Sequence, residues 1–381
     1  VVLLAGAKVA RGTPFAAWSL VGKLCPETCS AELASGLSDR DLWLALLAGQ
    51  LLIETRIFAT EKLDVDDQQK LGRVRHRLAA LVGGGRLPLV DRLSAGIILG
   101  KLGDPRPGVG LTKQGVPDID WIEIPAGTFW MGDKEDWCGK QRFQCKLLAQ
   151  PYRIARYPVT VTQFQAFVDA GGYRQAEWWT AAQAAGYWKE GRIRSRDWSE
   201  GGAEQWCEAP GVSGEAFRCP NSPVVDVNWF EALAFCRWLS EQLGCAVYLP
   251  SEAQWERAAR HTDGRLYPWG DSTNDVSRRC NMGETGIGHP SAVGMFPEGQ
   301  AKCGALDMAG NVWEWCRTKW REDYADYECE VDDTLEGDDL RVLRGGSFGF
   351  YADRVRCASR LGNFPDLRYS TFGFRVVVSP F

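Results

Sequence analysis

The sequence predicts an α+β domain preceded by a small helical region. Apolar residues recur at helical spacing in the first part of the chain, a glycine- and proline-rich stretch follows, and strand-like segments then alternate irregularly with short helices. Strands and helices that do not form repeated βα units are typical of the α+β class. We therefore divide the chain into a helical region (1–104), a linker (105–120) and a domain (121–381).

The helical region is predicted from its end signals. Ser38 precedes a long apolar stretch and is followed by two aspartates, which favour a helix N-terminus. A second helix is expected from Asp66 to a glycine cluster. A third ends at Gly103, with Pro105 as the stop. The faces of these helices are typical of ordinary bundle surfaces.

Three helices are expected in the domain. The first begins at Thr160 or Thr162, and the third at Ser251 with Gln254 at the capping-box position. The second carries an apolar stripe of Trp229, Leu233, Cys236 and Leu239 to Leu243. A Trp- and Gly-rich stretch at 172–220 has weak periodicity, and we interpret it as a surface insertion. The strand-like segments are IEIPAGTFWMGD, PYRIARY, AVYLP, RVLRGGS and GFRVVV.

Composition excludes several classes of protein. With 381 residues, 45% of them hydrophobic and 24% charged, the chain is a folded globular protein. A formal net charge of −5 gives no reason to expect nucleic acid or an anionic membrane as partner. No apolar run is long enough to span a bilayer. The opening VVLLAGAKVA has no basic region or initiator Met, so we interpret it as a fragment start and expect a cytoplasmic location by default.

The cysteine pattern argues against a zinc site. The thirteen cysteines contain no CxxC pair, and the three histidines (His76, His261, His289) lie far apart. Most of the cysteines are expected to be buried small hydrophobic residues, while disulfides stay open if the source is a thermophile.

Seven segments occur in the order found in one known family: IPAGTFWMGD, YPVTVTQF, PVVDVNWFEALAFCRWLSEQLG, YLPSEAQWERAAR, YPWGD, LDMAGNVWEW and LRGGSF…RCASR…GFR. They resemble the formylglycine-generating-enzyme (sulfatase-modifying factor) family, over most of Trp121 to Phe381. The resemblance implies that family's fold, a variant of the C-type lectin fold. The stretch LSAGIILGKLGDPRPGVGL resembles the connector that precedes such domains in larger bacterial proteins.

This chain lacks the pair of active-site cysteines that the family's enzymes use. Those enzymes carry two active-site cysteines after RGGS that serve copper-dependent oxidation. In this chain the only cysteine after Ser347 is Cys357, at the family's RCAAR position. One thiol can neither form a two-coordinate copper site nor exchange a disulfide. We therefore expect no catalytic residues, no copper and no enzymatic activity.

A structural calcium site is predicted in the segment LDMAGNVWEW. Its two carboxylates are seven residues apart around a Gly-Asn turn, a spacing that suits calcium, although a capped turn packed by Trp313 and Trp315 is the alternative. The family resemblance implies the ligands Asp307, Gly310, Val312 and Glu314. It also implies a second site at Asn281, Met282 and Ile287, where Thr285 replaces the carboxylate.

The C-terminal segment 341–377 interleaves a constant framework with residues that share no polarity or size. The framework contains Arg344, Arg356, Arg360, Arg368 and Arg375, which we expect to bind carbonyls or carboxylates. Bacterial relatives are dense in asparagine at the other positions, where this chain keeps only Asn363. The replacing residue types can all be reached from the codon AAC by changing adenines, and Lys, Glu, Gln, Met and Trp are absent from these sites.

This pattern resembles the variable proteins of diversity-generating retroelements, in which adenine-specific mutagenesis rewrites a C-terminal binding surface. Aromatic side chains among small ones are typical of such a paratope, with Phe348 and Phe372 as candidates for the core instead. The expected ligand-binding residues are Phe348, Gly349, Phe350, Tyr351, Asp353, Arg354, Leu361, Gly362, Asn363, Phe364, Leu367, Tyr369, Ser370 and Thr371.

The sequence therefore predicts a non-catalytic binding protein with a hypervariable surface for an unknown ligand, expected to be a protein. Two alternatives stay open. One is a formylglycine-generating or related metal-dependent oxidase. The other is a sensor or effector module of a larger signalling ATPase, suggested by the helical region and the linker.

Overall fold

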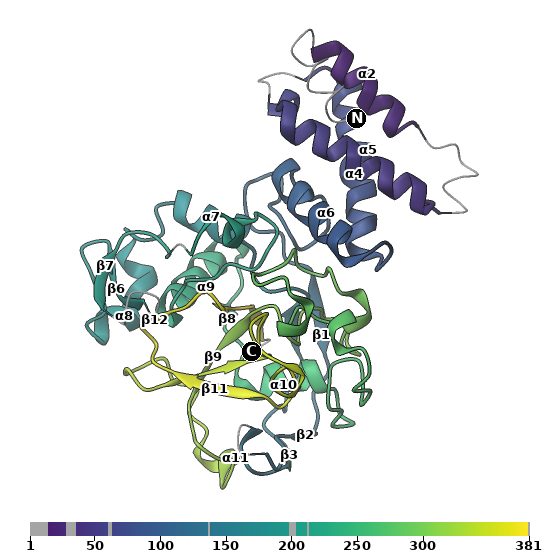
Figure 1. The fold of residues 1–381 in the computed structure, drawn as a ribbon. Coiled ribbons are helices and arrows are strands. Elements are labelled where there is room, and N and C mark those ends of the chain that lie inside the picture. Colours follow the sequence, from purple (N-terminus) through teal and green to yellow (C-terminus); the bar gives the residue numbers. More distant parts are fainter. Residues whose placement is uncertain are drawn as a thin grey trace. The chain divides into compact units, whose positions relative to one another are not determined.

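The computed structural model describes residues 14–27, 36–59, 63–135, 138–197, 203–211 and 213–379 (Figure 1). The chain divides into two compact units. The first spans Val1–Arg106 with Cys219–Asn221, and the second spans Pro107–Arg218 with Ser222–Phe381. None of the helices in the described ranges is both long and apolar enough to cross a membrane.

The first unit is helical. Ser38 caps its second helix, and Ser38 and Asp41 bond each other's backbone in a capping box. The third helix begins one residue before the predicted Asp66, because Asp64 is its N-cap. Gly49 lets the helices approach closely, since an added Cβ would lie 2.7 Å from Ile98. The helices are α2 (Pro14–Leu24), α4 (Asp39–Thr55), α5 (Val65–Gly83) and α6 (Leu89–Leu102), with a 3₁₀ turn η1 (Ile57–Ala59).

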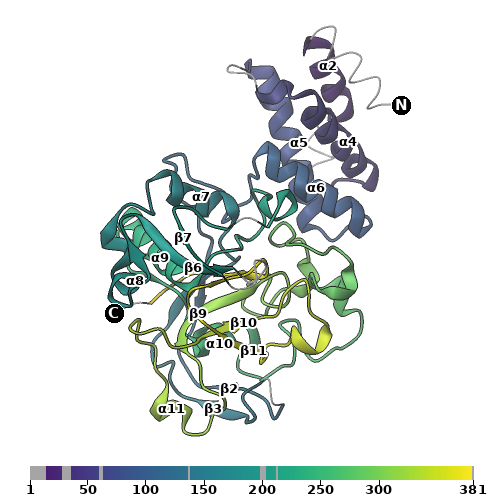
Figure 2. The same cartoon turned by 60° about the vertical axis from the view of Figure 1, so that its left-hand side comes forward.

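The second unit mixes small sheets and helices, which confirms the predicted α+β class with a preceding helical region (Figures 1 and 2). One sheet has the order β1 (Trp121–Ile124), β4 (Tyr152–Ala155), β14 (Val377–Val378), β8 (Val247–Tyr248). In it Ile154 pairs with Ile122 on one side and with Val377 on the other. The first and last strands of the unit therefore flank the same strand.

The central sheet has the order β11 (Arg360–Asn363), β10 (Arg341–Arg344), β9 (Trp313–Lys319), β13 (Phe372–Gly373). A third sheet joins β12 (Leu367–Arg368), β6 (Arg192–Asp197) and β5 (Trp188–Lys189), with β7 (Glu204–Cys207) on β6. The pair β2 (Phe129–Met131) and β3 (Phe143–Cys145) stands apart. The C-terminal segment thus supplies strands to three sheets.

Capping residues define the longer helices. Thr160, and not Thr162, begins α7, while Ser251 with Gln254 begins α10 as predicted. On α9 the predicted stripe ends too late, because Leu243 is 36% exposed. The helices are α7 (Val161–Asp169), α8 (Thr180–Ala184), α9 (Trp229–Leu243), α10 (Glu252–Arg260) and α11 (Tyr327–Glu330). The 3₁₀ turns are η3 (Ala176–Trp179), η5 (Glu215–Arg218), η6 (Val276–Arg278), η7 (Gly283–Thr285), η8 (Pro297–Gly299) and η9 (Ala352–Arg354).

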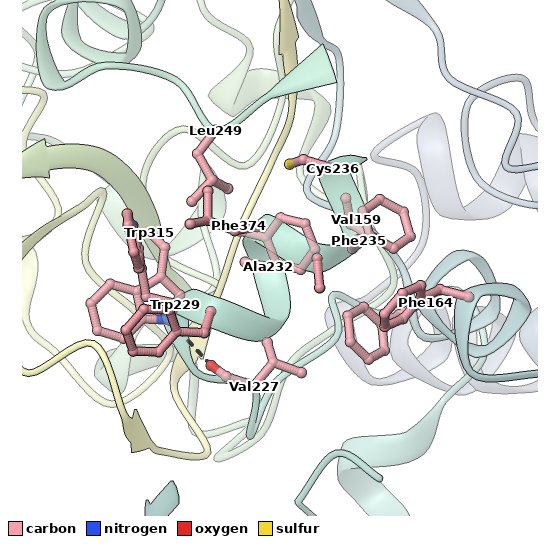
Figure 3. Packing of buried hydrophobic residues seen from close by; sticks show 14 of the residues in the cluster. Val159, Phe164, Val227, Trp229, Ala232, Phe235, Cys236, Leu249, Trp315 and Phe374 are labelled. Atoms are coloured by element: carbon pink, nitrogen blue, oxygen red, sulfur yellow. Dashed lines mark hydrogen bonds between the residues drawn. The ribbon is translucent and has the colours of Figure 1, made fainter. Parts of the chain in front are cut away.

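Helix α9 lies at the centre of the largest apolar core (Figure 3). Trp229 and Trp315 are both fully buried. Each indole N–H donates to a backbone carbonyl, Trp229 to Cys316 at 2.9 Å and Trp315 to Val227 at 3.1 Å. Both buried indole donors are therefore paired. Because the two hydrogen bonds join β9 to α9 and to Val227 just before the helix, they hold the strand against the helix.

The prediction of a surface insertion at 172–220 is wrong in its first half. Tyr173, Trp178 and Trp179 are buried in the same core as α9, and the ring of Trp178 lies 6.0 Å from that of Phe167. The hydroxyl of Tyr173 donates to Glu231. Residues 198–202 and 212 of this stretch lie outside the described residues.

Candidate ligand-binding surface of the C-terminal segment

Four framework arginines of the C-terminal segment bind buried carboxylates. Arg368, for example, donates to both oxygens of Glu231, at 2.9 and 2.6 Å. The acids come from α9, α10 and β9, so each pair ties the segment to an element distant in sequence. The pairs are Arg344 with Glu252 and Glu256, Arg360 with Glu252, Arg368 with Glu231, and Arg375 with Glu314.

Glu252 is the most heavily shared of these carboxylates. Besides Arg344 and Arg360, it accepts the hydroxyls of Tyr324 and Tyr327, at 2.9 and 3.0 Å. Burial alone raises the pKa of Glu252, but the charges of Arg360 and Arg344 outweigh it and hold the pKa below its ordinary value. The carboxylate therefore stays ionised and fixes the two arginines in place.

Of the remaining framework residues, Asp366 anchors the segment firmly and Arg356 only weakly. Asp366 is 1% exposed and accepts the Nε of Arg196 at 2.8 Å, which anchors the segment beside β6. Arg356 is the exception among the arginines, because its nearest acid is Glu135 at 3.5 Å. The expectation that arginines anchor the segment thus holds for Arg344, Arg360, Arg368 and Arg375 and only weakly for Arg356.

Most of the predicted ligand-binding residues reach the surface. Tyr351 is 65% exposed and Phe364 is 48% exposed. Gly349 is exposed as well. Eight others are partly exposed, namely Phe350, Asp353, Arg354, Leu361, Gly362, Asn363, Tyr369 and Ser370. Exposed residues thus alternate with the buried arginines along the segment.

Three of the predicted surface residues are buried instead. Phe348 packs edge-on against Phe217 at 6.0 Å and is 8% exposed. Leu367 is 6% exposed because it belongs to β12, which pairs with β6. Thr371 is also 6% exposed, and its carbonyl accepts the backbone N–H of Trp313 at 2.8 Å. Phe348 was also a candidate for the core on its sequence, as was Phe372, which is 3% exposed, whereas no sequence signal set Leu367 and Thr371 apart from their exposed neighbours.

Gly362 is partly exposed, but for a steric reason it does not accept a larger side chain. An added Cβ at this position would lie 2.4 Å from the indole of Trp320, closer than real contacts allow. At Gly349, by contrast, the nearest atom to an added Cβ is the Ser347 hydroxyl at 4.0 Å. Of these two glycines, only Gly349 accepts a side chain without movement of a neighbour.

Several surface residues pack against the same apolar core. Phe350, Leu361 and Tyr369 come from different parts of the segment, yet all pack against the core around α9. Phe350 lies edge-on against Trp313, with ring centroids 5.5 Å apart. Leu361 sits opposite Leu343 in the β10–β11 ladder. The core therefore supports positions that are separated in sequence.

Several neighbours of this surface could not be predicted from the sequence. Arg196 lies 4.5 Å from the ring of Phe364, in a cation–π contact. Phe217 contacts both Phe348 and His289. Trp320 covers Gly362. These contacts join elements far apart in the chain, so local pattern could not reveal them.

The predicted calcium loop places its two carboxylates in different surroundings. Glu314 is fully buried, and its oxygens accept Arg375 and the indole N–H of Trp255. Asp307 has a φ of 57° and accepts the backbone N–H of Gly294 at 2.7 Å. A calcium ion at Asp307, Gly310, Val312 and Glu314 would share the Glu314 carboxylate with a guanidinium. This site stays a prediction.

The second predicted set fits a cation poorly. The hydroxyl of Thr285 bonds to the Asn281 side-chain oxygen at 3.2 Å and to the Met282 carbonyl at 2.7 Å. The loop thus satisfies two of the three expected ligand oxygens by itself, and Thr285 supplies no charge. Neither Asn281, Met282 nor Ile287 contributes a carboxylate. Groups of three or more Asp, Glu, His or Cys suited to a metal are absent from the described ranges.

Cys357 lies in the interior, where it is 0% exposed. Burial raises the pKa of its thiol, so the thiolate is disfavoured. No disulfide joins Cys357 to another cysteine in the described ranges. Its carbonyl accepts Arg344 at 2.7 Å, so the residue belongs to the framework.

The chain is similar to one known family over most of its length. The model of the sulfatase-modifying factor enzyme 1-like domain matches residues 111–380. A formylglycine-generating enzyme of Thermomonospora curvata is 33% identical over 313 residues, 68% of this chain and 93% of that protein. A hercynine oxygenase of Mycolicibacterium thermoresistibile is 32% identical over 59% of this chain, which spans only half of that protein. An inactive C-alpha-formylglycine-generating enzyme 2 of Mus musculus is 30% identical, over 74% and 92% of the two chains.

A solved structure shares the fold of this domain. PvdO from Pseudomonas aeruginosa superimposes with a TM-score of 0.54 at 25% identity, over 72% of this chain and 99% of that one. Treponema denticola variable protein 1 has a TM-score of 0.49 at 22% identity, over 69% and 96% of the two chains. The domain after the helical region thus has the formylglycine-generating-enzyme type of C-type lectin fold.

The expectation that the chain is not an enzyme is contradicted. Relatives at 32–33% identity are named as enzymes, with two different activities. The expectation rested on the missing cysteine pair, which concerns one type of oxidation only. A missing pair cannot decide whether other chemistry is present.

Proposed function

The chain belongs to the family of sulfatase-modifying factor enzyme 1-like domains, and from this premise we propose that its C-terminal segment is a binding surface for a protein ligand. One observation carries the proposal. Along 341–377 Arg344, Arg360, Arg368 and Arg375 are buried in ion pairs, whereas eleven of the fourteen predicted ligand-binding residues reach the surface. A framework held by buried pairs lets exposed side chains change without refolding.

The surface has the composition of a protein-binding site. Tyr351 and Phe364 are large exposed aromatic residues, and Asp353, Arg354 and Ser370 add polar groups beside them. Aromatic residues bring large contact area at low entropic cost, and polar neighbours bring specificity. The proposed surface comprises Gly349, Phe350, Tyr351, Asp353, Arg354, Leu361, Asn363, Phe364, Tyr369 and Ser370.

The residue types at these positions favour diversification by a retroelement as their origin. All of them are accessible from AAC by adenine changes. The test is the DNA sequence from codon 344 onward and of the next few kilobases. A near-identical downstream repeat that differs only at its adenines supports diversification. Mixed codons without a repeat overturn it and leave a fixed surface with one partner.

A second candidate function is oxidation of a cysteine-containing peptide. The observation that favours it is the 33% identity to a formylglycine-generating enzyme over 93% of that protein. The purified chain would be incubated with such a peptide and copper under oxygen, and the aldehyde trapped with a hydrazide. Aldehyde above the level of a protein-free control supports this activity, and its absence excludes it.

A further inference from the structure

A pocket of about 320 Å³ lies between α9 and β8, and none of the proposed surface residues lines it. Its apolar walls include Leu233, Leu249 and Leu335. Figure 3 shows Leu249 above α9, with Cys236, another lining residue, on the helix. The volume falls within the range of ~300–1,000 Å³ that small-molecule sites occupy. The site is therefore large enough for a small organic ligand.

One face of α9 brings a cation to this pocket. Leu233, Arg237 and Glu241 are spaced by four residues, so they line the same side of the helix. The Nη1 of Arg237 donates to the Trp178 carbonyl at 3.4 Å and to the hydroxyl of Thr180. Both of these partners are uncharged.

The charge of Arg237 has no counter-ion among the described residues. Two acids line the pocket, but Glu241 accepts the indole of Trp178 at 2.8 Å and Glu177 is exposed, and neither pairs with Arg237. Burial lowers the pKa of Arg237, with no carboxylate near enough to offset it. A partly buried guanidinium in this state gains stability from an added anion.

A second arginine enters from β9. The Nε of Arg317 lies 3.5 Å from Asp333 and is buried without a hydrogen-bond partner. Arg317 lines the same pocket as Arg237. Arg237 and Arg317 therefore line one pocket, beside its apolar walls and the carboxylates of Glu177 and Glu241.

We propose that this pocket binds a small carboxylate with a compact apolar body. The carboxylate binds Arg237 and Arg317, and the body packs against Leu233, Leu249 and Leu335. Guanidinium groups match the planar geometry of a carboxylate, while the apolar walls exclude strongly hydrated inorganic anions. The site is independent of the C-terminal surface, and its occupancy does not rest on the function proposed for that surface.

The test measures binding to the intact chain by isothermal titration calorimetry. The probes are benzoate, octanoate and indole-3-acetate, with the corresponding alcohols as uncharged controls. We expect at least one carboxylate to bind at one site per chain, and its alcohol to bind about tenfold more weakly or worse. If none of the three carboxylates saturates a site at millimolar concentration, the proposal is overturned.

Variants locate the site. Arg237→Gln is expected to weaken carboxylate binding by about tenfold or more, with no effect on the alcohol. Arg192→Gln is the matched control, because Arg192 is 46% exposed and lies outside the pocket. Ala246→Phe fills the rim and abolishes binding, which keeps the test decisive should Arg237→Gln fail to fold. Unchanged affinity in a folded Arg237→Gln protein overturns the proposal.

Discussion

The guanidinium of Arg360 donates to both carboxylate oxygens of Glu252, at 2.7 and 3.1 Å, although the two residues are 108 positions apart. Both side chains are fully buried. The pair fixes one end of β11 to the first turn of α10 while Leu361, Gly362 and Asn363 of the same strand stay partly exposed. Rigidity and surface variation thus coexist within four residues.

Removal of the Glu252 charge is expected to destabilise the fold strongly. Glu252→Gln leaves the buried guanidinium of Arg360 without a carboxylate partner, although Arg344 keeps Glu256, and the loss costs about 3–5 kcal/mol. Urea unfolding measures the change. Asp353→Asn is the matched control, because the Asp353–Arg354 pair is long, at 3.5 Å, and nearly half exposed, so it contributes at most about 1 kcal/mol. Equal effects of the two substitutions would contradict the assigned role of Glu252.

Glu252 also predicts loss of stability in acid. Burial raises its pKa, but Arg360 and Arg344 hold the folded value below the ordinary 4.5. The unfolded chain therefore binds more protons on acidification, so this contribution is complete above pH 4.5 and is lost as pH falls through the folded pKa. Unfolding free energies measured between pH 7 and 3 should fall below pH 4.5, and less steeply in Glu252→Gln. If the unfolding free energy falls equally in wild type and Glu252→Gln, then Glu252 is not the group responsible for the loss of stability in acid.

Gly362→Ala and Gly349→Ala are expected to differ. The first places a Cβ against Trp320 and forces the indole to move, at a cost of about 1–3 kcal/mol. The second places a Cβ in open space and changes stability little. Thermal unfolding of the two variants decides the point. Wild-type stability of Gly362→Ala would return this residue to the set of variable positions.

Tyr351→Ala and Leu367→Ala separate binding from folding. Tyr351 is 65% exposed, so its truncation should leave stability within about 0.5 kcal/mol of wild type while weakening any protein ligand selected on this surface. Leu367 is 6% exposed, so its truncation should cost about 2–5 kcal/mol. Chemical denaturation and surface plasmon resonance provide the two measurements. A ligand insensitive to Tyr351→Ala and Phe364→Ala would show that binding occurs elsewhere.

Calcium is expected to raise the melting temperature by binding at Asp307, since a ligand specific for the folded state stabilises it by mass action. Scanning calorimetry in calcium and in chelator measures the shift, and Asp307→Asn should remove it. Magnesium serves as the ionic-strength control. Identical melting in calcium and chelator would show that the Glu314–Arg375 pair leaves no room for the ion.

Helix starts were predictable because capping is local. Ser38, Thr160 and Ser251 each bond a backbone N–H three residues ahead, so a window of four residues contains the whole signal. The framework arginines were predictable as anchors for a related reason, because a guanidinium in a buried setting requires acceptors wherever they come from. Their partners Glu231, Glu252, Glu256 and Glu314 were not predicted, since each lies more than sixty residues away.

By itself the sequence determined the α+β class, the helix caps and the interleaved pattern of the C-terminal segment. Only the tertiary structure decided which residues of that pattern face solvent. Phe348 and Tyr351 are both aromatic and three residues apart, yet one is 8% exposed and the other 65%. The difference arises because Phe217, 131 positions before Phe348, covers one ring and not the other. Burial depends on such long-range contacts, whereas composition and capping depend only on neighbours in the chain.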